Sequence, residues 1–279
     1  MPREDTAPAG RLRPHRLRKP PDNAGMCLIA LAWKLHPRWR LLLAANRDEF
    51  HARPTAPLAR WPGEARELAG GRDLRSGGTW LAVDAGGRLA AVTNVRDPHA
   101  AQGGPSRGSL PLSFLRGAAD VPAFVAAQSR TGKTFAPFNL LVADAEACGF
   151  VGNHPPASTV LAPGIHGISN GAPDAPWPKV RRLEAAVHHW LSGPADDPAP
   201  LWHALADETV AADQTLPDTG VGLELERRLS PVFLRDARYG TRAGTLVAIG
   251  HDGRGWIAER RFGPDGIPLG ETRLPIGPA

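Results

Sequence analysis

The first residues that can do chemistry together are Met26 and Cys27, where the chain turns from a proline- and arginine-rich stretch into the apolar run MCLIALAWKL. If translation starts at Met26, removal of the methionine leaves Cys27 as the mature N-terminus, with a thiol and an α-amine on one residue. An α-amine has a pKa of about 7.7–8.0 and a thiol about 8.5, so the amine can accept the thiol proton near neutral pH. Cys27 is therefore a candidate nucleophile that carries its own base. The alternative is an inert cysteine buried in a β-strand, which is the commoner state of an unpaired cysteine.

A polar run at residues 46–49 directly follows the apolar segment 39–45. If 27–35 and 39–45 form an antiparallel hairpin with a turn at 36–38, the end of the second strand lies beside the start of the first. This hairpin brings the polar run close to Cys27. A carboxylate there can orient an ammonium group, and a guanidinium can favour a thiolate or bind a substrate carboxylate. The alternative is a solvated turn that holds a surface ion pair.

The elements that must position these residues are short and separated by turn residues. Helical spacing predicts helices over 109–116, 121–130 with Asp120 as its N-cap, 179–191, 201–206 and 223–229. Short apolar runs predict further strands over 79–83, 88–93, 139–143, 148–151, 158–161, 164–169, 244–249 and 256–262, and the glycine-rich motifs at 70–73 and 76–80 predict a long ordered loop. Strand groups that alternate with helix groups favour an α+β domain in which helices cover stacked sheets.

Composition and charge exclude several classes of protein. A chain of 279 residues can bury a core without disulfides, and none of its apolar runs is long enough to span a membrane. Residues 1–25 carry +3 of the net charge of +5, which leaves too little for a nucleic-acid-binding domain. The two cysteines, Cys27 and Cys148, cannot form a CxxC zinc site or a c-type haem attachment site. We therefore expect no metal, no cofactor and no nucleic-acid partner.

Residues 1–25 contain five prolines and no apolar periodicity, and they predict a disordered extension. Such an extension is either a start placed upstream of the true one or a propeptide. Residues 26–279 are predicted to form a single domain. The chain shows no secretory signal and no mitochondrial transit helix, which favours a cytoplasmic location.

Several separated motifs carry a family resemblance: MCLIALAW, AANRDEF, GGRDLRSGGTWLAVD, LAAVTN and YGTR. In this order, over residues 26–249, they resemble the NRDE family of proteins like the transport and Golgi organisation protein. That family is similar to N-terminal nucleophile (Ntn) hydrolases of the penicillin V acylase and bile salt hydrolase type. The resemblance implies a four-layered αββα sandwich.

The resemblance also implies roles for individual residues. Cys27 is similar to the nucleophile, Arg47 and Asp48 to the pair that positions it and its amine, and Asn94 to an oxyanion-site residue. Asn170 would match a second amide donor; such a donor contributes about 2.7–4 kcal/mol when it points to the developing oxyanion. The adjacency of Arg47 to Asp48 departs from the acylase pattern, where arginine and aspartate are separated, so their roles are open to exchange. For both asparagines the alternative is a strand-terminal side chain that satisfies its own turn.

Three further residues are predicted to bind substrate. Asn46 and Glu49 belong to the polar run, and Arg242 in YGTR matches the far-side arginine of the acylases.

Two function classes follow. The first is a cysteine hydrolase that cleaves a linear amide or related acyl bond, a non-peptide C–N bond, in a small molecule through an acyl-enzyme on Cys27. The second is a non-catalytic binding or trafficking protein for haem or for acyl-CoA and lipid-like ligands. A purely structural protein is a third option, which the clustered polar residues disfavour.

Overall fold

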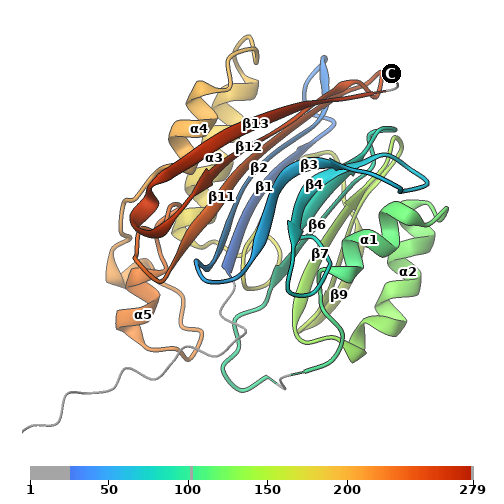
Figure 1. Cartoon of the computed structure of the whole chain (residues 1–279). Helices are drawn as coiled ribbons and strands as arrows, with labels where there is room; N and C mark the ends of the chain where they lie inside the picture. The colour runs from blue at the N-terminus through green and yellow to red at the C-terminus, as the bar shows by residue number, and fades with distance from the viewer. Residues whose placement is uncertain (1–25, 101–102, 278–279) are drawn as a thin grey trace, which may run out of the picture.

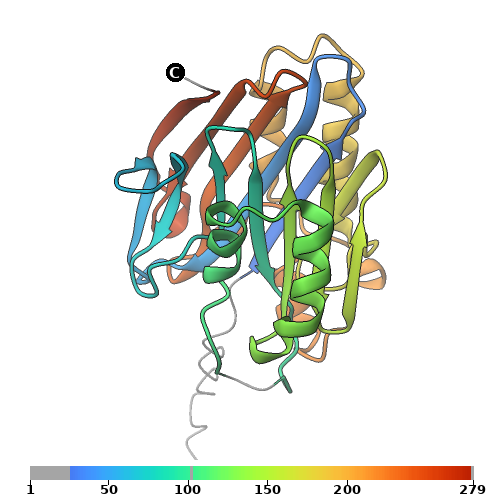
Figure 2. The same ribbon diagram turned by 90° about the vertical axis from the view of Figure 1, so that its right-hand side faces the viewer.

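The computed structural model describes residues 26–100 and 103–277, in which two antiparallel β-sheets pack face to face (Figure 1). The predicted disordered extension at residues 1–25 lies outside the described residues. Helices lie on the outer face of each sheet, so the layers follow the order helix, sheet, sheet, helix (Figures 1 and 2). This arrangement confirms the predicted αββα sandwich.

The first sheet has six strands, and every neighbouring pair in it is antiparallel. In spatial order its strands are β10 (Gly164–Ile168), β1 (Met26–Trp33), β2 (Trp39–Phe50), β11 (Tyr239–Gly250), β12 (Gly255–Phe262) and β13 (Pro268–Ile276).

The second sheet has seven strands, and its spatial order follows the chain. These strands are β3 (Thr55–Trp61), β4 (Leu68–Asp73), β5 (Leu81–Asp84), β6 (Leu89–Asn94), β7 (Phe138–Ala143), β8 (Cys148–Asn153) and β9 (Pro156–Val160).

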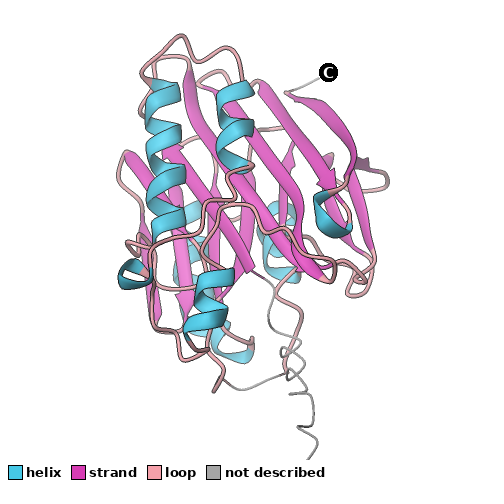
Figure 3. Ribbon diagram, turned by 90° about the vertical axis from the view of Figure 1, so that its left-hand side faces the viewer, coloured by secondary structure: helices cyan, strands magenta, loops and turns pink. Residues whose placement is uncertain are grey.

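Helices cover the two outer faces. Those on the seven-stranded sheet are α1 (Ser109–Arg116) and α2 (Val121–Thr131). On the other side, α3 (Pro178–Leu191) and α4 (Ala199–Leu205) lie in front of the strands in Figure 3, and α5 (Leu223–Arg228) lies below them at the end of this layer. Short 3-10 helices occur at Gly132–Thr134, Asp213–Thr215 and Pro264–Gly266. Within the described ranges, no helix is long and apolar enough to cross a membrane.

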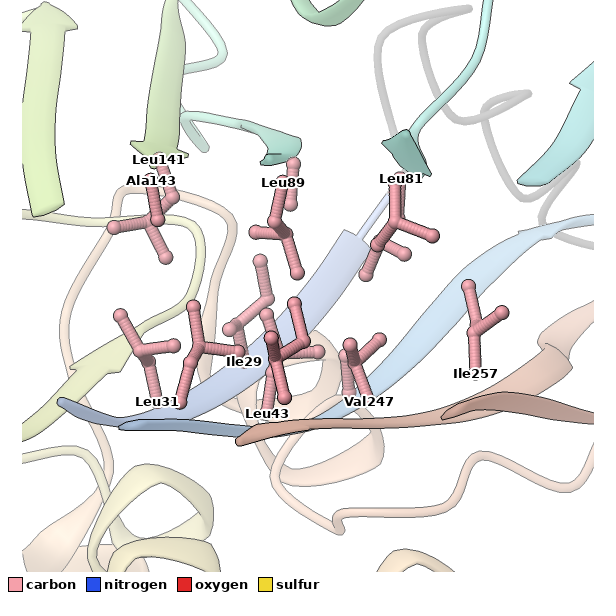
Figure 4. Close-up of a cluster of buried hydrophobic side chains, with 14 of the residues drawn as sticks. Ile29, Leu31, Leu43, Leu81, Leu89, Leu141, Ala143, Val247 and Ile257 are labelled. Carbon is pink, nitrogen blue, oxygen red and sulfur yellow. The ribbon is translucent and has the colours of Figure 1, made fainter. Parts of the chain in front are cut away.

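The apolar run of β1 is continuous because both faces of the strand are buried. Successive strand side chains point to opposite faces. Ile29 and Leu31 enter the core between the sheets, where Figure 4 shows them opposite Leu89 and Leu141 of the other sheet. Leu28, on the other face of β1, packs beneath the helices. A fully buried aliphatic side chain of this kind contributes about 1.5–3 kcal/mol, so this hairpin is firmly held.

The sequence predictions were mostly confirmed, with three corrections. All five helices and the α2 N-cap are present, since the Asp120 side chain accepts a hydrogen bond from the Ala123 N–H. The second strand was predicted to end at residue 45, yet β2 continues to Phe50, because β11 pairs with its polar end and supplies its hydrogen-bond partners. Residues 70–73 are strand β4 rather than loop, and β3 and β13 were not predicted. β13 is largely exposed and only Leu58 and Trp61 of β3 are buried, so both strands lack the apolar run that the prediction depended on.

Candidate functional site

Cys27 lies at the start of β1, one residue after the strand begins at Met26. In the antiparallel register of β1 and β2, Arg47 lies directly opposite Cys27 and Asp48 directly opposite Met26. The proximity inferred from the hairpin is therefore present in the structure. The physical reason is the length match of the two strands, which brings the polar end of β2 back to the start of β1.

The polar run of β2 divides between the two faces of the sheet. Arg47 and Glu49 continue the face that carries the core residues Leu43 and Ala45, so they lie between the sheets with Cys27. Asn46 and Asp48 alternate with them and point toward the helical layer. The four residues 46–49 therefore contribute side chains both to the space between the sheets and to the helical layer.

A cavity of about 660 Å³ opens beside Cys27, where strands β1, β2, β4 and β6 of the two sheets begin or end. Its lining is rich in charged and small polar residues. The lining comprises Cys27, Arg47, Asp48, Glu49, Arg53, Asp73, Arg75, Ser76, Thr79, Trp80, Val92, Asn94, residues 103–108 and Ala136. The predicted loop at residues 76–80 does border this cavity, whereas Trp80 also packs into the core between the sheets.

The Cys27 thiol is buried, with 7% of the residue exposed. Burial, together with the charges of Asp48 and Glu49, raises the pKa of this thiol to about 12, against the opposing effects of Arg47 and the Asp48 backbone N–H. With its nitrogen peptide-linked, Cys27 is consequently a neutral thiol at physiological pH. It needs a nearby proton acceptor to become a nucleophile.

Asp48 is a buried carboxyl group with one satisfied oxygen. Its Oδ1 accepts a hydrogen bond from Thr241 Oγ1 at 2.6 Å, while Oδ2 has no hydrogen-bond partner among the described residues. Burial raises the pKa of Asp48 to about 6, and the charge of Lys179 is the largest influence that lowers it.

Arg47 begins a chain of alternating charges along the cavity wall. Its Nη2 lies 3.6 Å from Glu49, which lies 3.6 Å from Arg53, and Arg53 in turn pairs with Asp73. Arg47 Nη1 is buried and has no hydrogen-bond partner within the part of the chain that the structure describes. A guanidinium in this state can still bind an acceptor on a ligand.

Asn94 and Asn170 are hydrogen-bonded neighbours, but Asn94 lines the cavity and Asn170 does not. Asn94 ends β6 and lines the cavity. Asn170 Nδ2 donates to the Asn94 carbonyl oxygen at 2.9 Å, so it holds the end of β6. Ser169 Oγ, which contacts Asn170 Oδ1, also lies 3.0 Å from the Cys27 carbonyl oxygen and joins this network to β1.

Two predicted substrate-binding residues do not lie at the cavity. Asn46 Nδ2 donates to the carbonyl oxygens of Leu205 and Val232 on the helical side, because the alternation of the strand turns it away from Arg47. Arg242 Nη1 donates to the carbonyl oxygens of Phe50 and Arg53. Neither is among the described residues that line the cavity, and both tie neighbouring segments to the sheet.

Sequence reasoning missed Lys179, the second residue of α3. It is 2% exposed, and its Nζ has no hydrogen-bond partner among the residues described. Lys179 precedes Leu183 and Val187 by four and eight residues, which places it on the buried stripe of the helix. The sequence did contain a signal for its burial, namely a lysine at helical spacing from buried apolar residues.

Nothing in the described ranges resembles a metal centre: no group of three or more His, Cys, Asp or Glu side chains is arranged to hold an ion.

Comparisons with known proteins agree with this architecture. The model of the Transport and Golgi organisation 2 family matches residues 26–264. A human relative, Transport and Golgi organization protein 2 homolog, is 32% identical over 274 residues, covering 89% of this chain and 97% of the relative.

Two solved Ntn hydrolases were also found. A mutant conjugated bile acid hydrolase from Clostridium perfringens aligns with a TM-score of 0.50 at 8% identity, covering 89% of this chain and 92% of that one. Penicillin V acylase from Agrobacterium tumefaciens aligns with a TM-score of 0.43 at 12% identity, covering 84% and 83%. The first likeness shows a shared sandwich fold.

Proposed function

The chain belongs to the Transport and Golgi organisation 2 family, also called NRDE, and from this premise we propose that it is a cysteine hydrolase of the Ntn type. The proposed reaction cleaves an amide or related acyl bond of a small molecule through an acyl-enzyme on Cys27. The support is the fold, the cavity beside Cys27, and the polar groups that converge on it.

The observation that carries the proposal is the unsatisfied carboxylate opposite the start of β1. Asp48 pairs with Met26 in the register, and its Oδ2 lacks a partner among the described residues. A free α-ammonium on Cys27 would supply a charged donor at this end of the strand. We therefore propose that the working chain begins at Cys27.

The reaction then proceeds in two halves. The α-amine takes the proton from Cys27 Sγ, and the thiolate attacks the substrate carbonyl carbon. Asn94 is the proposed donor to the resulting oxyanion, held in place by Asn170. The α-ammonium returns the proton to the leaving amine as the C–N bond breaks. Water, deprotonated by the same amine, then attacks the thioester carbonyl carbon; the C–S bond breaks, the acid is released, and the α-ammonium returns its proton to Cys27 Sγ.

The cavity wall supports a substrate that carries a negative charge. The four arginines that line it outnumber the three carboxylates, and these residues are Arg47, Arg53, Arg75 and Arg107 against Asp48, Glu49 and Asp73. Arg47 Nη1 is the buried donor still lacking a partner among the described residues. We propose that a carboxylate of the substrate binds at this guanidinium.

Turnover of the natively expressed protein tests the proposal, with an intact mass to establish where the mature chain begins. A panel of small amides and esters with and without a carboxylate should reveal hydrolysis by the wild type. Cys27→Ala should abolish it, and Cys27→Ser should leave only a small fraction. Cys148→Ala is the matched control, because Cys148 is the other free cysteine and lies in the core between the sheets.

Two outcomes would contradict the hydrolase. One is a mature chain that retains residue 26; the other is undiminished turnover by Cys27→Ala. The rival carrier function would appear as binding of haem or acyl-CoA that alkylation of Cys27 leaves unchanged, with no turnover across the panel.

A further inference from the structure

Lys179 is a charged residue in an unusual place for a lysine. It is almost fully buried in the first turn of α3, directly after Pro178. No ion pair within 4.0 Å and no hydrogen bond of its Nζ occurs among the described residues. Burial of an unpaired ammonium is costly, so an explanation is required.

The sheet holds this end of α3 closely. α3 packs against β1 and β10, and a Cβ built on Gly167 of β10 would lie 2.2 Å from Val180 Cγ1. Gly167 itself pairs with Ala30 of β1. The absence of a side chain at Gly167 thus lets the first turn of α3, which carries Lys179, approach the strand that begins at Met26.

Four charged or titratable groups act on Lys179, each from a different element. They are Arg96 after β6, Asp48 of β2, Cys27 of β1 and Glu226 of α5. Burial, together with the charge of Arg96, lowers the pKa of Lys179 to about 8, against the opposing effects of Asp48 and Cys27. Glu226 also raises this pKa and pairs directly with Arg96, but its effect on Lys179 is smaller than that of Arg96.

Asp48 and Lys179 are therefore two buried groups of opposite charge that act on one another without direct contact. Each has one atom without a hydrogen-bond partner in the described ranges, Oδ2 of Asp48 and Nζ of Lys179. Both lie on the helical side of the sheet, behind the strand that carries Cys27.

We propose that Lys179 is a positioning residue whose ammonium keeps Asp48 ionised and keeps the α-amine of Cys27 in its uncharged, proton-accepting form. This inference rests on the proposed function, because it requires the free α-amine. Asp48 alone would favour the ammonium form of the amine and leave the thiol without a base. A positive charge behind Asp48 offsets that preference and also favours the thiolate.

Lys179 neither gains nor loses a proton in this scheme. The S–H bond of Cys27 breaks and an N–H bond forms on the same residue, so the total charge of Cys27 is unchanged. Asp48 stabilises the ammonium that results, and Lys179 tunes how readily it forms.

The test is the pH profile of Cys27 alkylation by iodoacetamide, with peptide mapping to separate Cys27 from Cys148. Lys179→Met and Lys179→Gln remove the charge, and both should move the midpoint to higher pH by about one unit. Lys179→Arg retains the charge and should retain the wild-type midpoint. Lys133→Met is the matched control, since Lys133 is exposed in the 3-10 helix at Gly132–Thr134. Circular dichroism identifies the variants that fold.

A second probe separates this inference from the proposed function. 2-Cyanobenzothiazole reacts with a cysteine that has both a free thiol and a free α-amine. If the wild type is not labelled at Cys27, the proposed function fails and the role of Lys179 with it. If the wild type is labelled but the folded neutral variants share its alkylation profile, the role of Lys179 alone is overturned.

Discussion

Four consecutive polar side chains, at residues 46–49, have three different structural roles because they alternate between the two faces of one strand. Arg47 and Glu49 face the cavity and begin its chain of charges. Asn46 faces the helices and joins α4 to the loop that follows α5. Asp48 lies opposite the start of β1, and burial makes its carboxyl group costly to ionise.

The cost of ionising Asp48 predicts a pH-dependent effect of Asp48→Asn on stability. Burial raises the pKa of Asp48 to about 6, above its unfolded value near 3.8. The folded chain therefore binds this proton more tightly, and this carboxyl group lowers stability as the pH rises from about 4 to about 6. Asn cannot ionise, so the variant should be more stable than the wild type at pH 7, by on the order of 1–3 kcal/mol, and should lose activity.

Urea unfolding of both full-length chains from pH 3 to pH 7 checks this prediction. Below pH 4 the two unfolding free energies should converge, because Asp48 is then protonated in both states. A variant that is less stable at pH 7 would mean that the ionised carboxylate is a net stabilising group.

At the scale of elements, the site depends on how closely α3 approaches the six-stranded sheet. Gly167→Ala would place a methyl group against Val180 and Glu184. The valine is branched and held in the core beneath α3, so the helix must shift. We expect a loss of about 1–3 kcal/mol in stability, as in overpacked cores, and a fall in turnover because Lys179 moves with the helix.

Gly164→Ala is the control on the same strand, because the nearest atom to its new Cβ would lie 3.4 Å away, on the His166 ring. Thermal unfolding and turnover of both variants test whether the site depends on the close approach of α3. Equal behaviour of the two substitutions would show that α3 tolerates displacement.

The cap of α2 provides a prediction that concerns stability alone. Asp120 accepts a hydrogen bond from the Ala123 N–H at 2.8 Å, and Asp120→Ala should cost about 1 kcal/mol of unfolding free energy. Asp120→Ser keeps an acceptor at the cap and should retain most of that stability. Neither should change turnover, since α2 packs on the face of the seven-stranded sheet away from the cavity. A turnover loss that exceeds the loss of folded protein would contradict this separation.

At the scale of the whole molecule, three apolar clusters fill the spaces between four layers, and the cavity lies at an edge of the central space. The apolar residues in these clusters begin at Leu28. A chain that starts at Met26 therefore contains every cluster.

We predict that this shorter chain unfolds cooperatively at the same temperature as the full-length chain, within about 2 °C, which corresponds to less than roughly 1 kcal/mol for a protein of this size. Its intact mass should show loss of the initiating methionine, and turnover should appear with Cys27 at the N-terminus. A lower unfolding temperature would show that residues 1–25 stabilise the fold.

The sequence alone was enough to predict local structure and the pairing that brings Cys27 to Arg47. Apolar periodicity, an N-cap and turn residues are encoded within a few neighbouring positions, so helices α1, α2 and α3 and the β1–β2 hairpin followed from them. The family motifs predicted the sandwich, which the fold comparison confirmed.

Only the tertiary structure decided which side chains share the cavity and which charges lie behind it. Lys179 is separated from Cys27 by 152 positions along the chain, and its place depends on the packing of α3 against β1 and β10. Similarly, the edge strands β3 and β13 form because neighbouring strands offer them hydrogen-bond partners. Contacts of this kind depend on surfaces that meet after folding, and no local pattern in the chain encodes them.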